Sequence, residues 1–248
     1  MKIENKEFTE TLLAPDEPAP FVILNADSIL PVLLVCDHAS NRFPRSLGTM
    51  GLDYLNRVSH IALDIGANAI AEALADNLGA TAVLCQYSRL IVDCNRNLID
   101  DSAFLKYSDG VDVPGNHNLQ SSEKEKRVSE IYWPYHNAIK DQIVRLKKHG
   151  IDPVVISIHS FTPVINGNDR EWEMGVLWDK DPATAEIFLT RLVEAGFWLA
   201  IINHTLVRIL KISQLIFTLN QLDCRMWVSK YPKILLIMMM VLSVYRKP

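Results

Sequence analysis

The chain has 248 residues, of which 49% are apolar and 22% are charged, and its formal net charge is -4. These values are ordinary for a globular protein and argue against a disordered chain, and the length suits one large α/β domain or two small ones. The slight excess of acids gives no basis for a nucleic acid or an anionic membrane as partner, because both are bound by clustered Lys and Arg.

Cysteine usage and the apolar runs predict a cytoplasmic protein. The four cysteines have no CxxC spacing, and three of them lie in apolar runs, where a free thiol behaves as a small hydrophobic group. The first ten residues contain three acids and no apolar stretch, unlike a signal or transit peptide. The longest late apolar run, residues 234–244, is shorter than the roughly 20 residues that a membrane helix needs.

Five short apolar runs bounded by turn-forming residues predict strands, several of them buried on both faces. In chain order they are residues 31–36, 81–85, 89–93, 153–158 and 174–178.

Three longer segments have helical spacing of apolar residues. The first, residues 64–78, stops at Gly79, which suits the left-handed position after a helix. The second runs from a capping box of Ser122 and Glu125 to residue 148, and Pro134 is expected to kink or split it. The third begins with Asp181 and Pro182 as N-cap and first helical residue, and ends before Gly196.

Strands that alternate with helices of this length predict an α/β fold, a three-layer αβα arrangement around a mostly parallel mixed sheet. Residues 1–200 are expected to form one domain. In such sheets, sites gather at the carboxyl ends of the strands.

Polar side chains that suit a site occur at four such places. They are Asp37, His38 and Asn41; Asp64; Arg89, Asp93, Asn95 and Arg96; and His159 and Ser160. Imidazole and carboxylate ligands around an open position are what a catalytic zinc needs. Such a metal favours hydrolysis of an amide or ester.

Each group also has a purely structural explanation. Asp64 could simply cap the helix that follows it, and Asp93 could pair with Arg96 as a structural ion pair. Ser160 is a weak candidate for a nucleophile, because there is no GxSxG motif and Ser160 and its neighbour His159 point to opposite faces of a strand. His136 is expected to pack or to support the site rather than to bind a metal.

Six short segments in this order resemble the N-formylglutamate amidohydrolase family over roughly residues 20–200. They are "VCDHASNRFP", "HIALDIGA", "YSRLIVDCNR", "PYH", "SIHSFTP" and "GVLW". The resemblance implies a phosphorylase/hydrolase-like fold related to zinc exopeptidases. It also implies metal-dependent hydrolysis of a small N-acyl amino acid, with N-formyl-L-glutamate, which is cleaved to formate and glutamate in histidine degradation, as the first candidate.

The resemblance also implies roles for individual residues. In the wider exopeptidase group the site order is His-x-x-Glu, then Asn-Arg, then His, then a late catalytic Glu. Here Asn41 stands in place of the first Glu, so Asp64 becomes the candidate third metal ligand beside His38 and His159. Asp37 is a candidate to orient His38. The remaining candidates are Asn95, Arg96, Asn41 and Ser160 for the substrate, and Arg89 and His159 for catalysis.

The end of the chain departs from the family. Residues 201–248 hold seven Lys or Arg, one acid and no Gly. They lack the "DNxPYSG" and "EIRQDL" motifs that similar family members carry in this region, where the late Glu is expected. Codons can be chosen for residues 201–207 that, when the reading frame starts one base earlier, encode Asp-Asn-Gln-Pro-Tyr-Ser-Gly. The same shift lets codons for residues 227–235 encode Gly-Ile-Glu-Val-Ser-Gln-Asp-Leu. We therefore expect a frameshift near codon 200, an aberrant tail that is not a domain, and a chain prone to aggregate because "ILLIMMMVL" has no charge.

The sequence thus predicts an N-formylglutamate amidohydrolase-like enzyme, impaired by the loss of its catalytic Glu. Two alternatives stay open. One is an inactive relic that binds a small carboxylate ligand, and the other is a hydrolase of another N-acyl amino acid or short peptide. The expected partner is a small molecule and not a nucleic acid or a membrane. The expected cofactor is a divalent metal, with zinc as the first candidate, and the sequence leaves the oligomeric state open.

Overall fold

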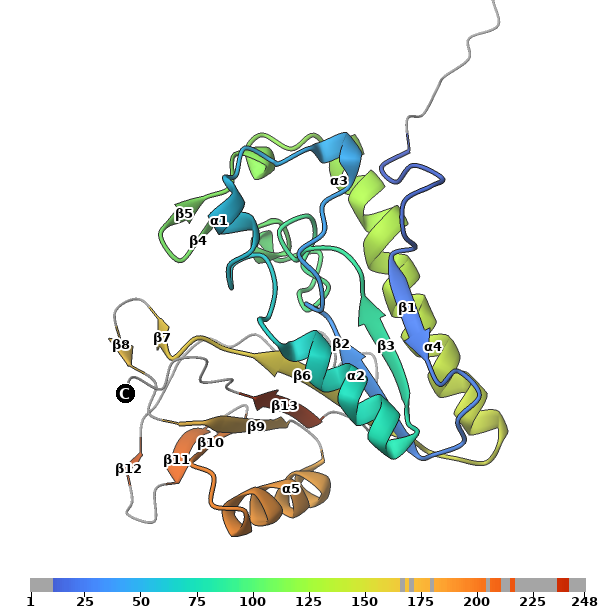
Figure 1. Ribbon diagram of the computed structural model, residues 1–248, viewed down its shortest axis with the longest axis vertical. Helices are drawn as coiled ribbons and strands as arrows, with labels where there is room; N and C mark the ends of the chain where they lie inside the picture. The colour runs from blue at the N-terminus through green and yellow to red at the C-terminus, as the bar shows by residue number, and fades with distance from the viewer. Residues whose placement is uncertain are drawn as a thin grey trace, which may run out of the picture.

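The structure is a computed structural model that describes residues 11–165, 168–169, 172–178, 181–203, 206–210, 215–216 and 236–240. Within these residues a nine-stranded sheet has the order β1-β3-β2-β6-β13-β9-β10-β11-β12 (Figure 1). Its strands are β1 (Phe21–Leu24), β2 (Val32–Cys36), β3 (Thr81–Cys85), β6 (Val154–Ser160), β9 (Met174–Trp178), β10 (Leu199–Asn203), β11 (Leu206–Leu210), β12 (Leu215–Ile216) and β13 (Leu236–Met240). Two short hairpins, β4 (Tyr107–Ser108) with β5 (Val111–Asp112) and β7 (Val164–Ile165) with β8 (Asn168–Asp169), lie outside it.

The centre of the sheet is parallel. Strand β2 pairs in parallel with both β3 and β6, and β6 pairs in parallel with β13. Strand β1 pairs antiparallel with β3, whereas β9 pairs antiparallel with β13 and in parallel with β10. The predicted α/β fold with a mixed, mostly parallel sheet is therefore confirmed. The predictions for residues 31–36, 81–85, 153–158 and 174–178 each match a strand of this sheet within two residues.

Helices cover both faces of the parallel centre. Alternate residues of β2 and β3 point in opposite directions, as the pleat requires. Leu34 and Leu84 belong to the cluster around helix α2 (Ala67–Leu78), whereas Val35 and Val83 belong to the cluster around helix α4 (Trp133–Lys148). Figure 1 shows α2 lying across β2 and β3, with α4 running beside β1.

Helix α2 begins later than predicted. Gly66 has a positive φ of 80° and is the residue before the first helical one, so the turn ahead of the helix is left-handed at a glycine. One alternative from the sequence was that Asp64 simply caps this helix. Its side chain makes no capping hydrogen bond to the helix. The predicted end is confirmed, because Gly79 is left-handed with φ 67° and donates its N–H to Ala75 and Asp76.

The second predicted helix is split, as Pro134 led us to expect. Helix α3 (Ser121–Arg127) continues through a π-helical turn, Val128–Tyr132, into α4, which has Pro134 in its first turn. The predicted capping box is wrong by two residues, because Glu123 accepts the backbone N–H of Gln120 at 2.8 Å.

The third predicted helix is confirmed as α5 (Pro182–Glu194), and the Asp181 side chain accepts the Thr184 N–H at 3.0 Å. Helix α5 packs on β9 and β10. Short helices complete the described part: α1 (Tyr54–Arg57) and three 3-10 turns at Arg45–Leu47, Asp101–Phe104 and Pro114–Asn116. Most of the predicted aberrant tail lies outside the described residues, and its described segments are the strands β10 to β13.

The segment 89–93 is buried, but it is a turn-rich loop and not the predicted strand. Side chains from distant segments take the place of a partner strand by donating to its carbonyl groups. Asn116 Nδ2 lies 2.8 Å from Leu90 O, and Arg127 Nη1 lies 3.0 Å from Ile91 O. The apolar run therefore indicates that this segment is buried, but it does not indicate that the segment pairs with another strand.

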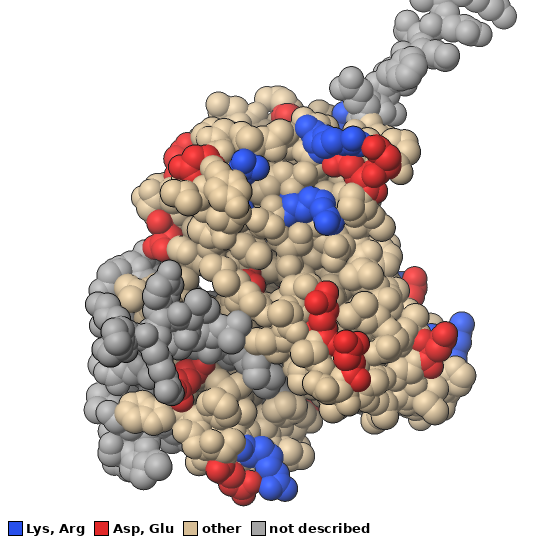
Figure 2. Space-filling view, viewed as in Figure 1, with Lys and Arg blue, Asp and Glu red and all other residues tan. Residues whose placement is uncertain are grey.

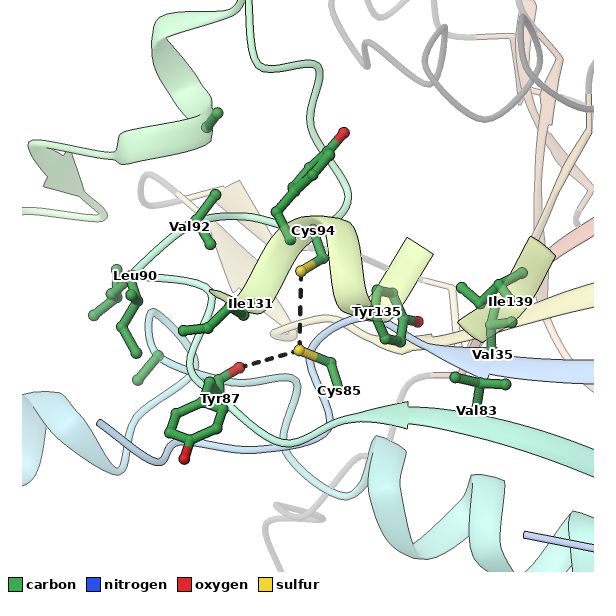
Figure 3. Close-up of a cluster of buried hydrophobic side chains, with 14 of the residues drawn as sticks. Val35, Val83, Cys85, Tyr87, Leu90, Val92, Cys94, Ile131, Tyr135 and Ile139 are labelled. Carbon is green, nitrogen blue, oxygen red and sulfur yellow. Dashed lines mark hydrogen bonds between the residues drawn. The ribbon is translucent and has the colours of Figure 1, made fainter. Parts of the chain in front are cut away.

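Cys85 and Cys94 lie in the apolar core between the sheet and α4. Their Sγ atoms are 3.9 Å apart among Val83, Ile131 and Tyr135 (Figure 3). Cys36 is also buried and free. The prediction that these thiols behave as small hydrophobic groups is confirmed for all three, whereas Cys224 lies outside the described residues.

The face shown in Figure 2 carries basic and acidic side chains in small, interspersed groups. In the part of the chain that the structure describes, the helices are all too short or too polar to pass through a membrane.

Candidate metal centre

Two histidines from neighbouring strands meet at the carboxyl end of the parallel sheet. His38 directly follows Asp37 at the end of β2, and His159 is the penultimate residue of β6. Their rings lie edge to face with centroids 5.0 Å apart. Both are buried, with exposed fractions of 2% and 4%.

Asp64 lies between the two rings. Its backbone N–H donates to His38 O at 3.0 Å, which holds the loop before α2 against the end of β2. Its Oδ2 atom lies 2.7 Å from His159 Nδ1 and 3.3 Å from His38 Nδ1. His38, Asp64 and His159 form a cluster whose potential ligand atoms all lie within 4.8 Å of one another, so the cluster could hold a metal ion.

Each imidazole has a second carboxylate on its far nitrogen. His38 Nε2 lies 2.8 Å from Asp93 Oδ1, and His159 Nε2 lies 3.2 Å from Asp37 Oδ2. The expectation that Asp37 orients His38 is therefore wrong. The reason is strand register: Val35 pairs with Ser157, so two residues further along Asp37 comes level with His159 on the same face.

The histidines and carboxylates of the cluster shift one another's pKa values. Burial by itself lowers the pKa of His159, but its hydrogen bonds to Asp37 and Asp64 outweigh burial and raise that pKa to about 10. Burial by itself raises the pKa of Asp64, but the two histidines outweigh it and hold that pKa well below the ordinary value. The buried carboxylates thus favour the charged form of the imidazole, and the imidazoles favour the charged form of Asp64.

The donor set fits a divalent metal. The Nδ1 atom of His38 is buried, lies near Asp64 and makes no hydrogen bond to the described residues, so a buried polar atom is left without a partner. A cation between this atom, His159 Nδ1 and Asp64 would satisfy it. Two imidazoles and one carboxylate are a zinc ligand set that keeps a coordination position open.

The two arginines of the site have different surroundings. The Arg89 guanidinium is held by two carboxylates, with Nη2 2.8 Å from Asp93 Oδ2 and Nη1 3.4 Å from Asp64 Oδ1. The alternative of a structural ion pair between Asp93 and Arg96 is therefore wrong, because Asp93 pairs with Arg89. Arg96 is half-buried, and its guanidinium has no hydrogen-bond or ion-pair partner among the described residues.

The other predicted site residues lie at different distances from the cluster. Asn95 Nδ2 is 3.5 Å from His159 Nε2, and the Ser160 backbone N–H donates to Asp64 at 3.3 Å. Asn41 is turned elsewhere, since its side chain donates to Arg57 O at 3.0 Å. His136 packs on Tyr132 and lies 3.1 Å from Cys94 O through Nε2, which agrees with the packing interpretation.

Tyr135 and Ser157 are part of the site, and sequence reasoning did not assign them a role. The Tyr135 hydroxyl donates to Asp37 Oδ1 at 3.0 Å, and the Ser157 hydroxyl donates to Asp37 Oδ2 at 3.1 Å. The one available signal for Ser157 was its place two residues before His159 in a buried strand, which puts both side chains on one face.

The fold and the cluster together define an α/β protein with a candidate metal-hydrolase site at the carboxyl end of a parallel sheet. The family model for N-formylglutamate amidohydrolase matches residues 30–204. The chain therefore belongs to the N-formylglutamate amidohydrolase family, and it is an amidohydrolase-like enzyme.

Two solved structures are similar over nearly the whole chain. A gene product of Agrobacterium tumefaciens shares 30% sequence identity with a TM-score of 0.82, over 93% of this chain and 88% of that one. An N-formylglutamate amidohydrolase from Ralstonia eutropha JMP134 shares 17% identity with a TM-score of 0.64, over 93% and 89%, and supports the fold alone. Among curated proteins, none matches the chain.

Proposed function

We propose that this protein hydrolyses the amide bond of a small N-acyl amino acid, with N-formyl-L-glutamate as the first substrate to test. The observation that carries the proposal is the buried His38–Asp64–His159 cluster at the carboxyl end of the sheet, in a chain of the N-formylglutamate amidohydrolase family. Formate and L-glutamate would be the products.

His38, Asp64 and His159 would hold a divalent cation, for which zinc is the first candidate because the ligands are nitrogen and oxygen atoms. When bound, such a cation polarises a carbonyl group and lowers the pKa of a bound water to about 7. Asp93 keeps the His38 ring in place from the opposite nitrogen. Outer carboxylates of this kind orient metal-binding imidazoles.

Arg96 would bind the carboxylate of the substrate, with Asn95 beside it. What supports this role is that the Arg96 guanidinium is half-buried and has no carboxylate partner among the described residues. A free guanidinium offers two parallel N–H donors that match a carboxylate. Ser160 and Asn41 would also contact the substrate. Asn41 would first have to give up the hydrogen bond that its side chain donates to Arg57 O.

Arg89 would stabilise negative charge on the scissile carbonyl oxygen. Its two carboxylate partners fix the guanidinium at the cluster, and 20% of the side chain is still exposed. His159 would serve the reaction as a metal ligand. The three carboxylates described at the cluster, Asp37, Asp64 and Asp93, are all engaged by histidines, and we infer that the general base of the family is the late Glu lost from this chain.

Two proteins test the proposal, the chain as it stands and a version with the reading frame restored after residue 200. Each is incubated with zinc and N-formyl-L-glutamate, and formate is measured. We expect the restored version to release formate and this chain to be slower by about 10²- to 10⁴-fold, the usual contribution of a positioned general base. If neither version cleaves this or any other N-acyl amino acid to the free amino acid, the proposal is wrong.

The composition break after residue 200 favours a second candidate, an inactive relic that binds a carboxylate ligand without turnover. Calorimetry with L-glutamate distinguishes the two. Binding by this chain without formate release, while the restored version is active, supports the relic. The gene sequence around codon 200 tests the frameshift directly.

A further inference from the structure

Asp37 is a fully buried carboxylate that binds three side chains from two different elements. Tyr135 of α4 contacts its Oδ1 atom at 3.0 Å, and Ser157 of β6 contacts its Oδ2 atom at 3.1 Å. The third neighbour is His159 Nε2, at 3.2 Å from Oδ2. Asp37 therefore connects helix α4 to a histidine of the candidate metal centre.

The hydrogen-bond directions around Asp37 determine where the His159 ring carries its proton. Tyrosine and serine hydroxyls each have one proton, and both direct it at Asp37, which as a carboxylate can only accept. Ser157 Oγ, 3.0 Å from His159 Nε2, is then left as an acceptor toward the ring. The two nearest neighbours of Nε2, Ser157 Oγ at 3.0 Å and Asp37 Oδ2 at 3.2 Å, are thus both acceptors, and Nε2 carries a hydrogen toward them, with the Asn95 side-chain amide farther away at 3.5 Å.

A neutral imidazole with its hydrogen on Nε2 has its lone pair on Nδ1. In this structure His159 Nδ1 is the atom that faces Asp64 Oδ2, at 2.7 Å. Both ring nitrogens therefore face a carboxylate, Asp37 at Nε2 and Asp64 at Nδ1. Where Asp64 and His159 together hold a cation, Nδ1 gives up its hydrogen, and Nε2 keeps the one that points at Asp37.

We propose that Asp37 is a positioning residue for His159, that Tyr135 and Ser157 hold it in that role, and that His159 binds the metal through Nδ1. The inference rests on the metal site of the proposed function and deepens it. It assigns to helix α4, which supplies none of the proposed metal ligands, an effect on metal affinity that passes from the Tyr135 hydroxyl through Asp37 to His159.

The test uses the full chain and zinc alone, with the dissociation constant measured by competition against a chromophoric chelator at fixed pH. The variants are Asp37→Asn, Tyr135→Phe and Ser157→Ala. The matched control is Tyr87→Phe, which removes another buried tyrosine hydroxyl, one that donates to Pro18 O at 2.8 Å away from the site.

We expect Asp37→Asn to weaken zinc binding by about 10- to 100-fold, the usual effect of losing an outer partner of a metal-binding histidine. Tyr135→Phe and Ser157→Ala should each weaken it several-fold, and Tyr87→Phe should leave it unchanged. Equal zinc affinity in wild type, Asp37→Asn and Tyr135→Phe would overturn the inference while leaving the metal site intact. Absence of zinc binding by the wild type would overturn the inference and the proposed metal site together.

A second measurement starts from the wild type, so its first result does not depend on the folding of a variant. In ¹⁵N-labelled wild type loaded with zinc, the His159 ring should show a protonated Nε2 and a metal-bound Nδ1. The opposite assignment, zinc on Nε2 and the proton on Nδ1, would overturn the inference. Tyr135→Phe should increase the exchange rate of the Nε2 proton, which a merely structural Tyr135 would leave unchanged.

Discussion

His38 and His159 stand edge to face with ring centroids 5.0 Å apart, because β2 and β6 are parallel neighbours that end at the same edge of the sheet. Each ring has one nitrogen on an outer carboxylate, and the other nitrogen faces Asp64. This arrangement brings two imidazoles from remote segments around one position, which the proposed hydrolase chemistry requires.

Replacing His38 should abolish metal binding. We expect about one equivalent of zinc in the purified wild type and less than about a tenth of that in His38→Gln, because two remaining ligands rarely hold zinc. The matched control is His60→Gln, since His60 pairs with Asp109 at 2.7 Å on the surface. Plasma mass spectrometry measures the metal, and equal content in the two variants would contradict the assignment.

Removing the metal should lower the stability of the fold. A ligand that binds only the native state at 100 times its dissociation constant adds about 2.7 kcal/mol to the free energy of unfolding. Chelation by EDTA should therefore lower the melting temperature of the wild type, and zinc should restore it. In His38→Gln neither treatment should change the melting temperature, and a zinc-dependent rise there would show that zinc stabilises the chain elsewhere.

The two arginines of the site should differ in their contribution to stability. Arg89→Met leaves the buried carboxylate of Asp93 without its guanidinium partner, and we expect a loss of about 3 to 5 kcal/mol in the free energy of unfolding. Arg96→Met removes no described ion pair and should cost less than about 1 kcal/mol. Urea unfolding followed by circular dichroism measures both. A larger loss for Arg96→Met than for Arg89→Met would contradict the stabilising ion pair between Arg89 and Asp93.

Helix α2 offers a matched pair of alanines. Ala71 is fully buried against the sheet, whereas Ala73, on the same helix, is exposed. Ala71→Leu should destabilise the protein by about 1 to 3 kcal/mol, because the extra atoms overpack the interface. Ala73→Leu should change stability by less than about 0.5 kcal/mol. Equal effects in thermal unfolding would show that α2 does not pack as described.

Thiol reactivity provides a test of the core. Cys36, Cys85 and Cys94 are buried and free, so none should react with a thiol reagent such as Ellman's reagent in the native protein. At most the thiol of Cys224 should react before unfolding, and all four should react in guanidinium chloride. Rapid reaction of two or more thiols under native conditions would contradict the packing around Cys85 and Cys94.

Local patterns in the sequence predicted much of the fold. Gly79 and the Asp181-Pro182 pair marked a helix end and a helix start correctly, because capping depends on residues a few positions apart. Strands 81–85 and 174–178 were predicted to the residue, since a short apolar run between turn formers is typical of a buried strand. His38 and His159 were grouped because polar residues directly after buried strands gather at one edge of an α/β sheet. Asp64 was added as the candidate third ligand because the family resemblance left Asn41 in the place of a Glu.

Tertiary structure alone decided which partner each charged group has. The register between β2 and β6 places Asp37 on His159 and not on His38. The apolar run 89–93 is a loop because Asn116 and Arg127, far along the chain, satisfy its carbonyl groups. The chain itself determines periodicity and caps, which act over a few residues, whereas hydrogen-bond partners across the core depend on how whole elements pack.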